Sequence, residues 1–419
     1  MQKTWLVAAL SAVVGATFLA PGLAPGAMAQ EKKLTLLTWN LPIYEEKFRG
    51  WIADFKELHP DFEVEWLDKK GTEWATFYQT QLIAGTAPDI IDVQGMLWAE
   101  YAAADGLVDL TPYLDKEPDV RDRFNKEGMT LWQYDGRQYM LPYYFSKSLM
   151  IYNKNLFEAA GLDGPPDSLE AILEDGRKIA ATDEGRSGFI TLNFDWLYWP
   201  LFAMNGVELL NEDMTEAAFN TPEMLDTLTK LAEATSAGVV NNIAWTGRWV
   251  EPNNAFATGD IGMYQAHGAA LFWIAGNAEW VNQDTLGVAA WPGGWGVPNA
   301  HGLGISASTK YPDEAFDFLK IATSDKWQTV MADTFTILTL NEKVDEALIA
   351  GLDDPLKAET LRLSLANMDK ATGNWVTPKD AAIKEAFWPE IQAALLGQKS
   401  PQEAIDAAES KVNRALRRR

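Results

Sequence analysis

Residues 34–93, LTLLTWNLPIYEEKFRGWIADFKELHPDFEVEWLDKKGTEWATFYQTQLIAGTAPDIIDV, contain the pattern that decides the fold. Three short segments of strand character, 34–39, 62–66 and 89–93, are separated by two longer segments with helical spacing of their apolar residues. The first helical segment ends at His59-Pro60, because proline cannot continue a helix. Strands that alternate with helices of this length predict a parallel sheet with helices on both faces.

The same alternation continues through the rest of the chain. Further strands are expected at 148–152, 261–264, 286–290 and 304–307, and clear helices at 168–181 and 222–237. A loop rich in Gly, Pro and Trp occupies 291–298, and the chain from residue 312 onward is mainly helical. Because 419 residues suffice for more than one domain, the pattern predicts an α/β protein with a second lobe.

The N-terminus has the pattern of an export signal. Met1-Gln2-Lys3 is a short positive start, an apolar stretch follows to Ala20, and Ala27-Met28-Ala29 matches the A-x-A pattern of a signal-peptidase site. We therefore expect a signal peptide at 1–29, with an uncleaved membrane anchor as the alternative. The chain has no cysteine, which excludes disulfides and a lipid anchor on an N-terminal Cys. The expected compartment is the periplasm of a cell with an outer membrane.

Composition restricts the partners that the chain can have. There are 59 Asp and Glu residues against 35 Lys and Arg residues, a formal net charge of −24, which argues against nucleic acid or an anionic membrane as a partner. Tryptophan is the unusual residue, with 18 in the chain. Some of these must fill the core, but such a surplus also suits a surface that binds sugar rings, whose C–H faces stack on aromatic faces.

A secreted glycoside hydrolase is the main alternative function, because aromatic clefts with carboxylates also describe glycosidases. The chain contains no G-x-S-x-G elbow, no H-E-x-x-H motif and no P-loop. Its three histidines, His59, His267 and His301, lack metal-ligand spacing, and no thiol is present. We therefore expect neither a cofactor nor a metal, and a purely structural role fits a single non-repetitive α/β chain poorly.

Six groups of segments, taken in chain order, carry a resemblance to a known family. They are 34–60; 82–90 (LIAGTAPDI) with 106–110 (GLVDL); 141–143 (LPY) with 150–157 (MIYNKNLF); 256–263 (FATGDIGM); 302–306 (GLGIS) with 315–319 (AFDFL); and 397–404, a G-x-x-S-P-x-E-A ending. In this order and spacing they resemble the extracellular solute-binding proteins of sugar importers, the family that contains maltose-binding protein. The resemblance spans nearly the whole chain after the signal peptide.

The resemblance implies a two-lobe periplasmic binding protein fold of type II, in which each lobe is a mostly parallel sheet flanked by helices. It divides the chain into an N-terminal lobe (30–146 plus 307–345), a C-terminal lobe (147–306) and C-terminal helices over both lobes (346–419). The chain would cross between the lobes near 145–148 and return near 306–308, and these crossings would act as a hinge around a ligand.

The family's activity then implies the partners. The chain is expected to bind a carbohydrate, most simply a di- or oligosaccharide, and to deliver it to the transmembrane permease subunits of an ABC importer. It is expected to act as a monomer without a direct membrane anchor and without catalysis. Polyols and glycerophosphodiesters remain open as ligands, because the sequence does not name the sugar.

Sugar hydroxyls need groups that donate and accept hydrogen bonds, and sugar rings need apolar faces. In the first lobe, candidate residues follow the predicted strands: Trp39, Asn40, Glu73, Trp74 and Gln94. Each has a structural alternative; Trp39 can be a half-buried turn residue, and Glu73 can simply favour the helix dipole.

At the first crossing, alignment with the family places Ser146 at a ligand-contacting position, with Tyr144 as its neighbour. The family member has a carboxylate at this position, so the sequence does not support a preference for maltose. In the second lobe, Trp196 lies in an aromatic segment before W-P and falls on the family's stacking aromatic residue.

The remaining candidates lie further along the chain. They are His267, where the family turns toward its ligand; Trp291 and Trp295 in the glycine-rich loop; and Trp375 and Trp388 near the end. Glycine lets the backbone approach a ligand closely, so an indole of this loop can cover a sugar ring. A lone histidine is ordinarily structural, and Trp388, which aligns with a ligand-stacking Trp, is followed by Pro389.

Overall fold

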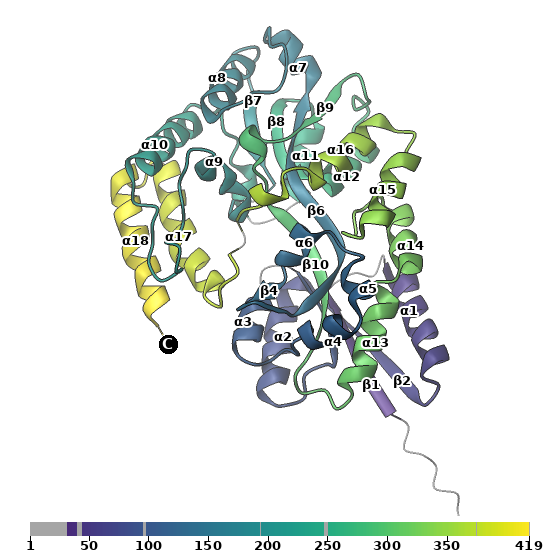
Figure 1. The fold of residues 1–419 in the computed structure, drawn as a ribbon. Coiled ribbons are helices and arrows are strands. Elements are labelled where there is room, and N and C mark those ends of the chain that lie inside the picture. Colours follow the sequence, from purple (N-terminus) through teal and green to yellow (C-terminus); the bar gives the residue numbers. More distant parts are fainter. Residues whose placement is uncertain are drawn as a thin grey trace, which may run out of the picture.

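The computed structural model describes residues 32–39, 44–94, 98–192, 194–246, 250–373 and 375–418. It is a mixed α/β structure of two lobes, joined by strands that belong to both (Figure 1). The expected signal peptide (1–29) and the candidate Asn40 lie outside the described residues.

The first lobe is built on the segment quoted at the start. Strands β1 (Lys32–Trp39), β2 (Phe62–Lys69) and β3 (Ile90–Gln94) pair in parallel in the order β2-β1-β3. Leu34 and Leu36 of β1 pack in one cluster with helices α1 (Glu45–Leu58) and α13 (Pro312–Ala322), and Leu37 packs in another with α2 (Gly71–Ile83). The continuous apolar run of β1 therefore reflects burial on both faces of the sheet.

Two long strands connect the lobes. Strand β6 (Met140–Asn153) pairs in its first half with β10 (Pro298–Ile305), which also pairs with β3. The second half of β6 pairs with β8 (Ile261–His267) and β9 (Leu286–Ala289) of the second lobe. All four of these pairings are antiparallel, and they make one hydrogen-bonded path from β2 to β7 (Ser187–Thr191).

The second lobe repeats the two-sided packing. One face of its sheet packs in a cluster with α8 (Leu169–Ala180), α10 (Pro222–Ser236) and two C-terminal helices, α17 (Asp380–Leu395) and α18 (Pro401–Arg417). The other face packs with α11 (Val250–Ala257) and α12 (Gly268–Asn277).

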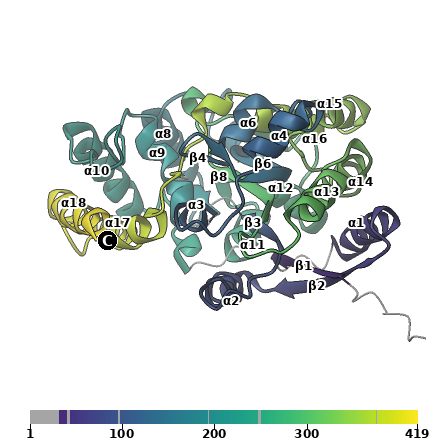
Figure 2. The same cartoon turned by 60° about the horizontal axis from the view of Figure 1, so that its bottom comes forward.

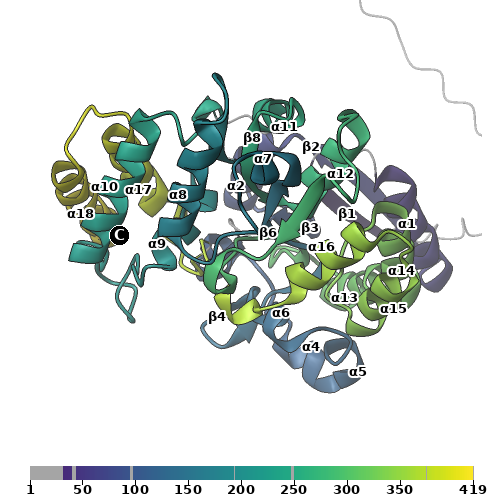
Figure 3. The ribbon, with the colours of Figure 1, turned by 90° about the horizontal axis from the view of Figure 1, so that it is seen from above.

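The C-terminal helices pack on different parts of the molecule. Helix α15 (Glu342–Gly351) packs against α14 (Asp325–Phe335) on the first lobe, and α16 (Pro355–Leu365) contacts both α15 and β6. Figures 2 and 3 show α17 and α18 beside α10, at the far end of the molecule from α1. The elements not yet named are α3 (Trp98–Ala103), α4 (Thr111–Lys116), α5 (Pro118–Arg121), α6 (Lys126–Thr130), β4 (Gln133–Tyr134), β5 (Arg137–Gln138), α7 (Lys154–Ala159), α9 (Pro200–Ala203) and the 3-10 turns η2 (Trp196–Tyr198), η3 (Ile243–Thr246), η4 (Pro292–Gly294) and η5 (Met368–Lys370).

The structure differs from the sequence-based expectation in two respects. Residues 301–305 were expected in the C-terminal lobe (147–306), but they pair with β3 of the first lobe. The sheets are also less parallel than expected: β1, β2 and β3 pair in parallel, as do β7 and β8, whereas both strands that join the lobes pair antiparallel with their neighbours. Antiparallel pairing arises because β10 returns along β6 from the second lobe.

The described helices were also compared with the length of a membrane span. Among them, no helix combines the length and the apolar character needed to cross a bilayer.

Candidate functional site

One face of the joining strands carries a row of side chains that form hydrogen bonds. In the β6–β10 pair, Tyr144 lies opposite His301 and Ser146 lies opposite Asn299. Gln94 of β3 lies opposite His301 on the other side of β10. Because alternate residues of a strand share a face, these side chains form one row along the crossing, which we call the polar row.

The first-lobe end of the polar row is a connected network. The Gln94 Nε2 donates to Asn299 Oδ1 at 2.9 Å, and the Asn299 Nδ2 lies 3.4 Å from the hydroxyl of Tyr144. The Tyr144 ring meets the His301 ring edge-on, with the centroids 5.3 Å apart. Burial raises the pKa of Tyr144 to about 12, so its phenol stays protonated and can donate a hydrogen bond.

A buried aspartate and an indole complete this end of the row. His301 Nδ1 lies 2.9 Å from Asp92 Oδ1, and the other oxygen of Asp92 accepts from the backbone N–H of Trp39 at 3.2 Å. The Trp39 ring lies 5.7 Å from the His301 ring, centroid to centroid, and is half-buried. Asp92 thus fixes both the imidazole and the position of the indole at the end of β1.

The second-lobe end of the row is formed by Trp196 and His267. Their rings are stacked, with centroids 5.4 Å apart and an interplanar angle of 26°. Ser146 connects the two ends, because its Oγ accepts from the N–H of Gly268 at 3.3 Å. Neither ring nitrogen of His267 has a hydrogen-bond partner among the described residues, and burial lowers the pKa of its imidazole to about 3. The imidazole is therefore neutral, with one donor and one acceptor available.

The structure brings five of the predicted site residues into or beside this row: Trp39, Gln94, Tyr144, Ser146 and Trp196, which stacks on a sixth, His267. Sequence reasoning missed Asp92, Asn299 and His301 as members of the row. The alternation of Asn299 and His301 around the small residue Ala300 is a strand signal, but Pro298 and Gly302 on either side obscure it.

Four predicted residues lie elsewhere. Trp74 is fully buried and stacks on Tyr78 in the first-lobe core, and Glu73 is exposed at the start of α2. Trp291 and Trp388 belong to the large cluster of the second lobe. The indoles of Trp74 and Trp388 fill space in the cores of the two lobes, which is the structural alternative that an aromatic residue always carries. Trp291 is also buried, but its ring nitrogen has no hydrogen-bond partner among the described residues.

Trp295 and Trp375 lie in segments that run next to the second-lobe end. The backbone bridge between Gly296 and Ala371 holds these two segments together. Gly373 adopts a φ of +91°, and a Cβ at this position would lie 3.0 Å from the carbonyl oxygen of Trp196. Glycine is required here because only its backbone fits this conformation and this approach.

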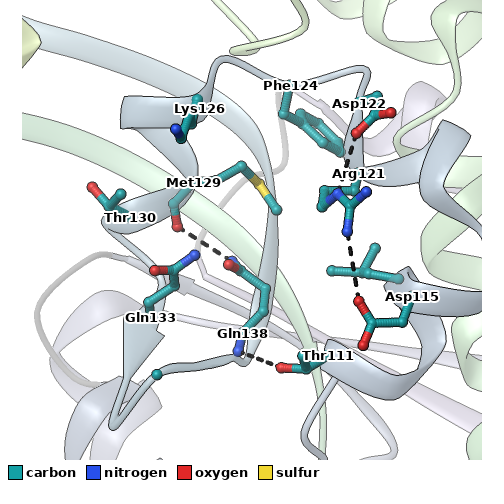
Figure 4. A pocket seen from close by; sticks show the side chains of 12 residues that line it. Thr111, Asp115, Arg121, Asp122, Phe124, Lys126, Met129, Thr130, Gln133 and Gln138 are labelled. Atoms are coloured by element: carbon teal, nitrogen blue, oxygen red, sulfur yellow. Dashed lines mark hydrogen bonds and ion pairs between the residues drawn. The ribbon is translucent and has the colours of Figure 1, made fainter.

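A separate pocket of about 420 Å³ lies in the first lobe between α4, α5, α6 and the β4–β5 hairpin (Figure 4). Two cations line it, Lys126 and Arg121, and Arg121 is paired with Asp115 and Asp122, at 3.5 and 3.2 Å. None of the residues predicted from the sequence lines it. The candidate functional site is therefore the polar row with Trp39 and Trp196 at its ends.

Comparison with known proteins agrees with this architecture. The profile of a family described as bacterial extracellular solute-binding protein matches residues 39–329. A binding protein of Brucella abortus is 25% identical over 412 residues, which cover 94% of this chain and 96% of the relative. The diacetylchitobiose-binding protein of Streptomyces coelicolor is 24% identical over 393 residues, which cover 87% and 86% of the two chains.

The fold also matches solved structures. One is an ABC substrate-binding protein from Listeria monocytogenes in complex with cycloalternan. It superposes with a TM-score of 0.76 at 23% identity, over 92% of this chain and 98% of the other. At this level of identity the likeness establishes the fold.

Proposed function

This chain belongs to the bacterial extracellular solute-binding protein family, and we infer from this that it is the substrate-binding subunit of an importer. The chain binds a carbohydrate, a di- or oligosaccharide, between its two lobes and passes it to the permease of an ABC importer. The observation that carries this proposal is the polar row, which runs from the first sheet to the second with an indole at each end.

The row offers what a sugar needs. Gln94, Asn299 and Tyr144 supply amide and hydroxyl groups that both donate and accept, as sugar hydroxyls do. Trp39 and Trp196 supply apolar faces at the two ends for the C–H faces of sugar rings. A span between two indoles on different lobes favours a ligand of more than one ring.

Binding is coupled to the joining strands. Strands β6 and β10 join the two lobes and form the hinge about which one lobe rotates relative to the other. A ligand that contacts both ends of the row gains contacts only when the lobes close, so it shifts the population toward the closed form. The closed form is the form that the permease recognises.

The chain binds its ligand without converting it. Asp92 is the carboxylate that contacts the polar row, and both of its oxygens accept hydrogen bonds within the protein. A glycosidase needs two carboxylates that flank the scissile bond, and Asp92 is already engaged within the protein. We also propose that the mature protein is a periplasmic monomer that is exported by a cleaved signal peptide.

A screen of the mature protein against neutral saccharides tests the proposal. We expect at least one di- or oligosaccharide to raise the melting temperature, to bind with micromolar affinity in calorimetry, and to be recovered unchanged by chromatography. Binding by none of a broad saccharide panel would contradict carbohydrate transport. Turnover of the ligand would instead support the glycoside hydrolase.

A further inference from the structure

Three buried polar side chains on the second-lobe sheet lack hydrogen-bond partners. Gln265 has an exposed fraction of 0%, and both atoms of its amide are unpaired among the described residues. His267 and Trp291, exposed by 4% and 1%, likewise leave their ring nitrogens unpaired in the described part of the chain. We call these three residues the second-lobe cluster.

The three side chains share one face of the sheet. Gln265 and His267 are alternate residues of β8, so they point the same way. Met150 of β6 lies opposite Gln265 on one side and opposite Ala289 of β9 on the other, and Trp291 follows Ala289 by two residues. Met150, Ala289 and Trp291 pack in the large hydrophobic cluster of the second lobe, so Gln265, His267 and Trp291 lie on the sheet face that this cluster covers.

Leaving such groups unpaired is costly. A buried polar group without a partner costs about 1–3 kcal/mol, and nearly all buried polar atoms in proteins are paired. Here the three side chains share one face of the sheet, and the ring of Trp196 stacks on His267 at the end of the polar row. Their shared position next to the proposed site indicates that a ligand supplies the missing partners.

The chemistry of the cluster restricts that ligand. A primary amide and a neutral imidazole each present a donor and an acceptor, and an indole N–H presents a donor. Hydroxyl groups match this mixture, because each can donate and accept. A phosphate or carboxylate could use only the donors of these groups, because its oxygens accept and do not donate, and it would leave the acceptors of Gln265 and His267 unpaired.

The cations of the region are engaged elsewhere. Lys147 precedes Ser148 on β6, and its Nζ donates to the carbonyl oxygens of Ala366 and Asn367 at the end of α16. Lys384 pairs with Asp380 on α17 at 2.8 Å. Both cations therefore already have partners within the protein.

We propose that Gln265, with His267 and Trp291, binds an uncharged, hydroxyl-bearing end of the ligand and excludes anionic solutes. The proposal rests on the proposed function and deepens it, since it names a specificity residue and the charge class of the ligand. Because Trp196 covers His267 in this structure, its indole moves off the imidazole when the ligand enters.

The test uses the full mature chain and two matched leucine substitutions. Gln265→Leu removes an unpaired amide, whereas Gln328→Leu removes an equally buried amide whose Nε2 donates to Pro142 O at 3.2 Å and Thr339 O at 3.5 Å. The probes are maltose, cellobiose and N,N′-diacetylchitobiose as neutral ligands, and glucose 1-phosphate and sn-glycerol 3-phosphate as anionic ligands. Melting temperature without ligand and calorimetric Kd are measured for each protein.

We expect Gln265→Leu to keep or raise the melting temperature and to weaken binding of the neutral probe by about 10-fold or more. Gln328→Leu should lower the melting temperature and leave the Kd within about twofold, since its lost hydrogen bonds are internal. If Gln265→Leu does not fold, Gln265→Met provides the same comparison with a more flexible side chain.

The outcomes separate this inference from the proposed function. Binding of a neutral probe with an unchanged Kd in folded Gln265→Leu would overturn the inference and leave carbohydrate binding intact. Tighter binding of either phosphate than of every neutral probe would also overturn it. Absence of binding by all saccharides would remove the proposed function and this inference together.

Discussion

Replacing Gly188 with alanine is expected to lower the free energy of unfolding by about 3 kcal/mol, near the upper end of what overpacking costs. Gly188 of β7 lies against Gly176 of α8, and a Cβ on Gly188 would lie 2.4 Å from the Cα of Gly176 and 2.8 Å from its carbonyl carbon and oxygen. These are backbone atoms, so no side-chain rotation can relieve the contact. Helix α8 would have to move away from the sheet of the second lobe.

Urea denaturation measures this effect, and Gly276→Ala is the matched control. Gly276 lies in helix α12, and a Cβ there would meet no atom within 4 Å. Alanine is a better helix former than glycine, so this variant should be more stable by about 0.4–1 kcal/mol. A Gly188→Ala protein as stable as the wild type would mean that α8 and β7 do not approach as closely as described.

Acid is expected to destabilise the protein through His267. Burial lowers the pKa of this imidazole to about 3, below its ordinary value of 6.5, because an imidazolium here would be a buried charge. Between these two values the unfolded chain binds a proton that the folded chain does not. The stability that comes from the neutral imidazole is therefore complete above pH 6.5 and is lost as the pH falls toward 3.

Comparing the wild type with His267→Gln isolates this contribution. Between pH 6.5 and pH 4.5, the variant should gain stability relative to the wild type by about 2 kcal/mol, measured as the difference in free energy of unfolding. Burial raises the pKa of Asp195 to about 6 and that of Asp345 to about 7, which acts in the opposite direction, but both aspartates are present in both proteins.

A second histidine serves as the control for this experiment. The Nε2 of His59 lies 2.9 Å from Asp317, so this imidazole, unlike that of His267, has a partner in the folded protein. His59→Gln makes the same substitution and leaves the unpaired imidazole of His267 in place. Parallel pH profiles for the wild type and His267→Gln would show that the imidazole of His267 is not buried as the structure has it.

The fold was predictable where the spacing of buried apolar residues within one segment of the sequence indicates a strand or a helix. The strand at 34–39 and its neighbour β3 are buried on both faces, so their apolar runs and the helical spacing between them are visible in the sequence. The pairing of β10 was not predictable in this way. Its residues 298–302 contain Pro, Asn, His and Gly, and its partners in β3 and β6 are far away in the sequence.

The site was predictable only in part, for a similar reason. Position after a strand drew attention to Trp39 and Gln94, which the structure places in or beside the polar row, but it also selected Trp74, whose indole is turned into the core. A Trp that follows a strand can fill the core or cover a ligand, and its position in the sequence does not distinguish these two roles. Gln265 was missed because one polar residue inside a strand does not reveal that its amide lacks a partner.

Calorimetry on Trp39→Ala and Trp196→Ala, with one saccharide that binds the wild type, tests the central claim most directly. If the ligand is held from both lobes, each substitution should weaken binding by about 10-fold or more while the protein stays folded. Trp327→Ala removes a half-buried indole that bonds to Asp54, away from the row, and should leave the affinity within about twofold. An unchanged affinity in either Trp39→Ala or Trp196→Ala would contradict a site that spans the two lobes.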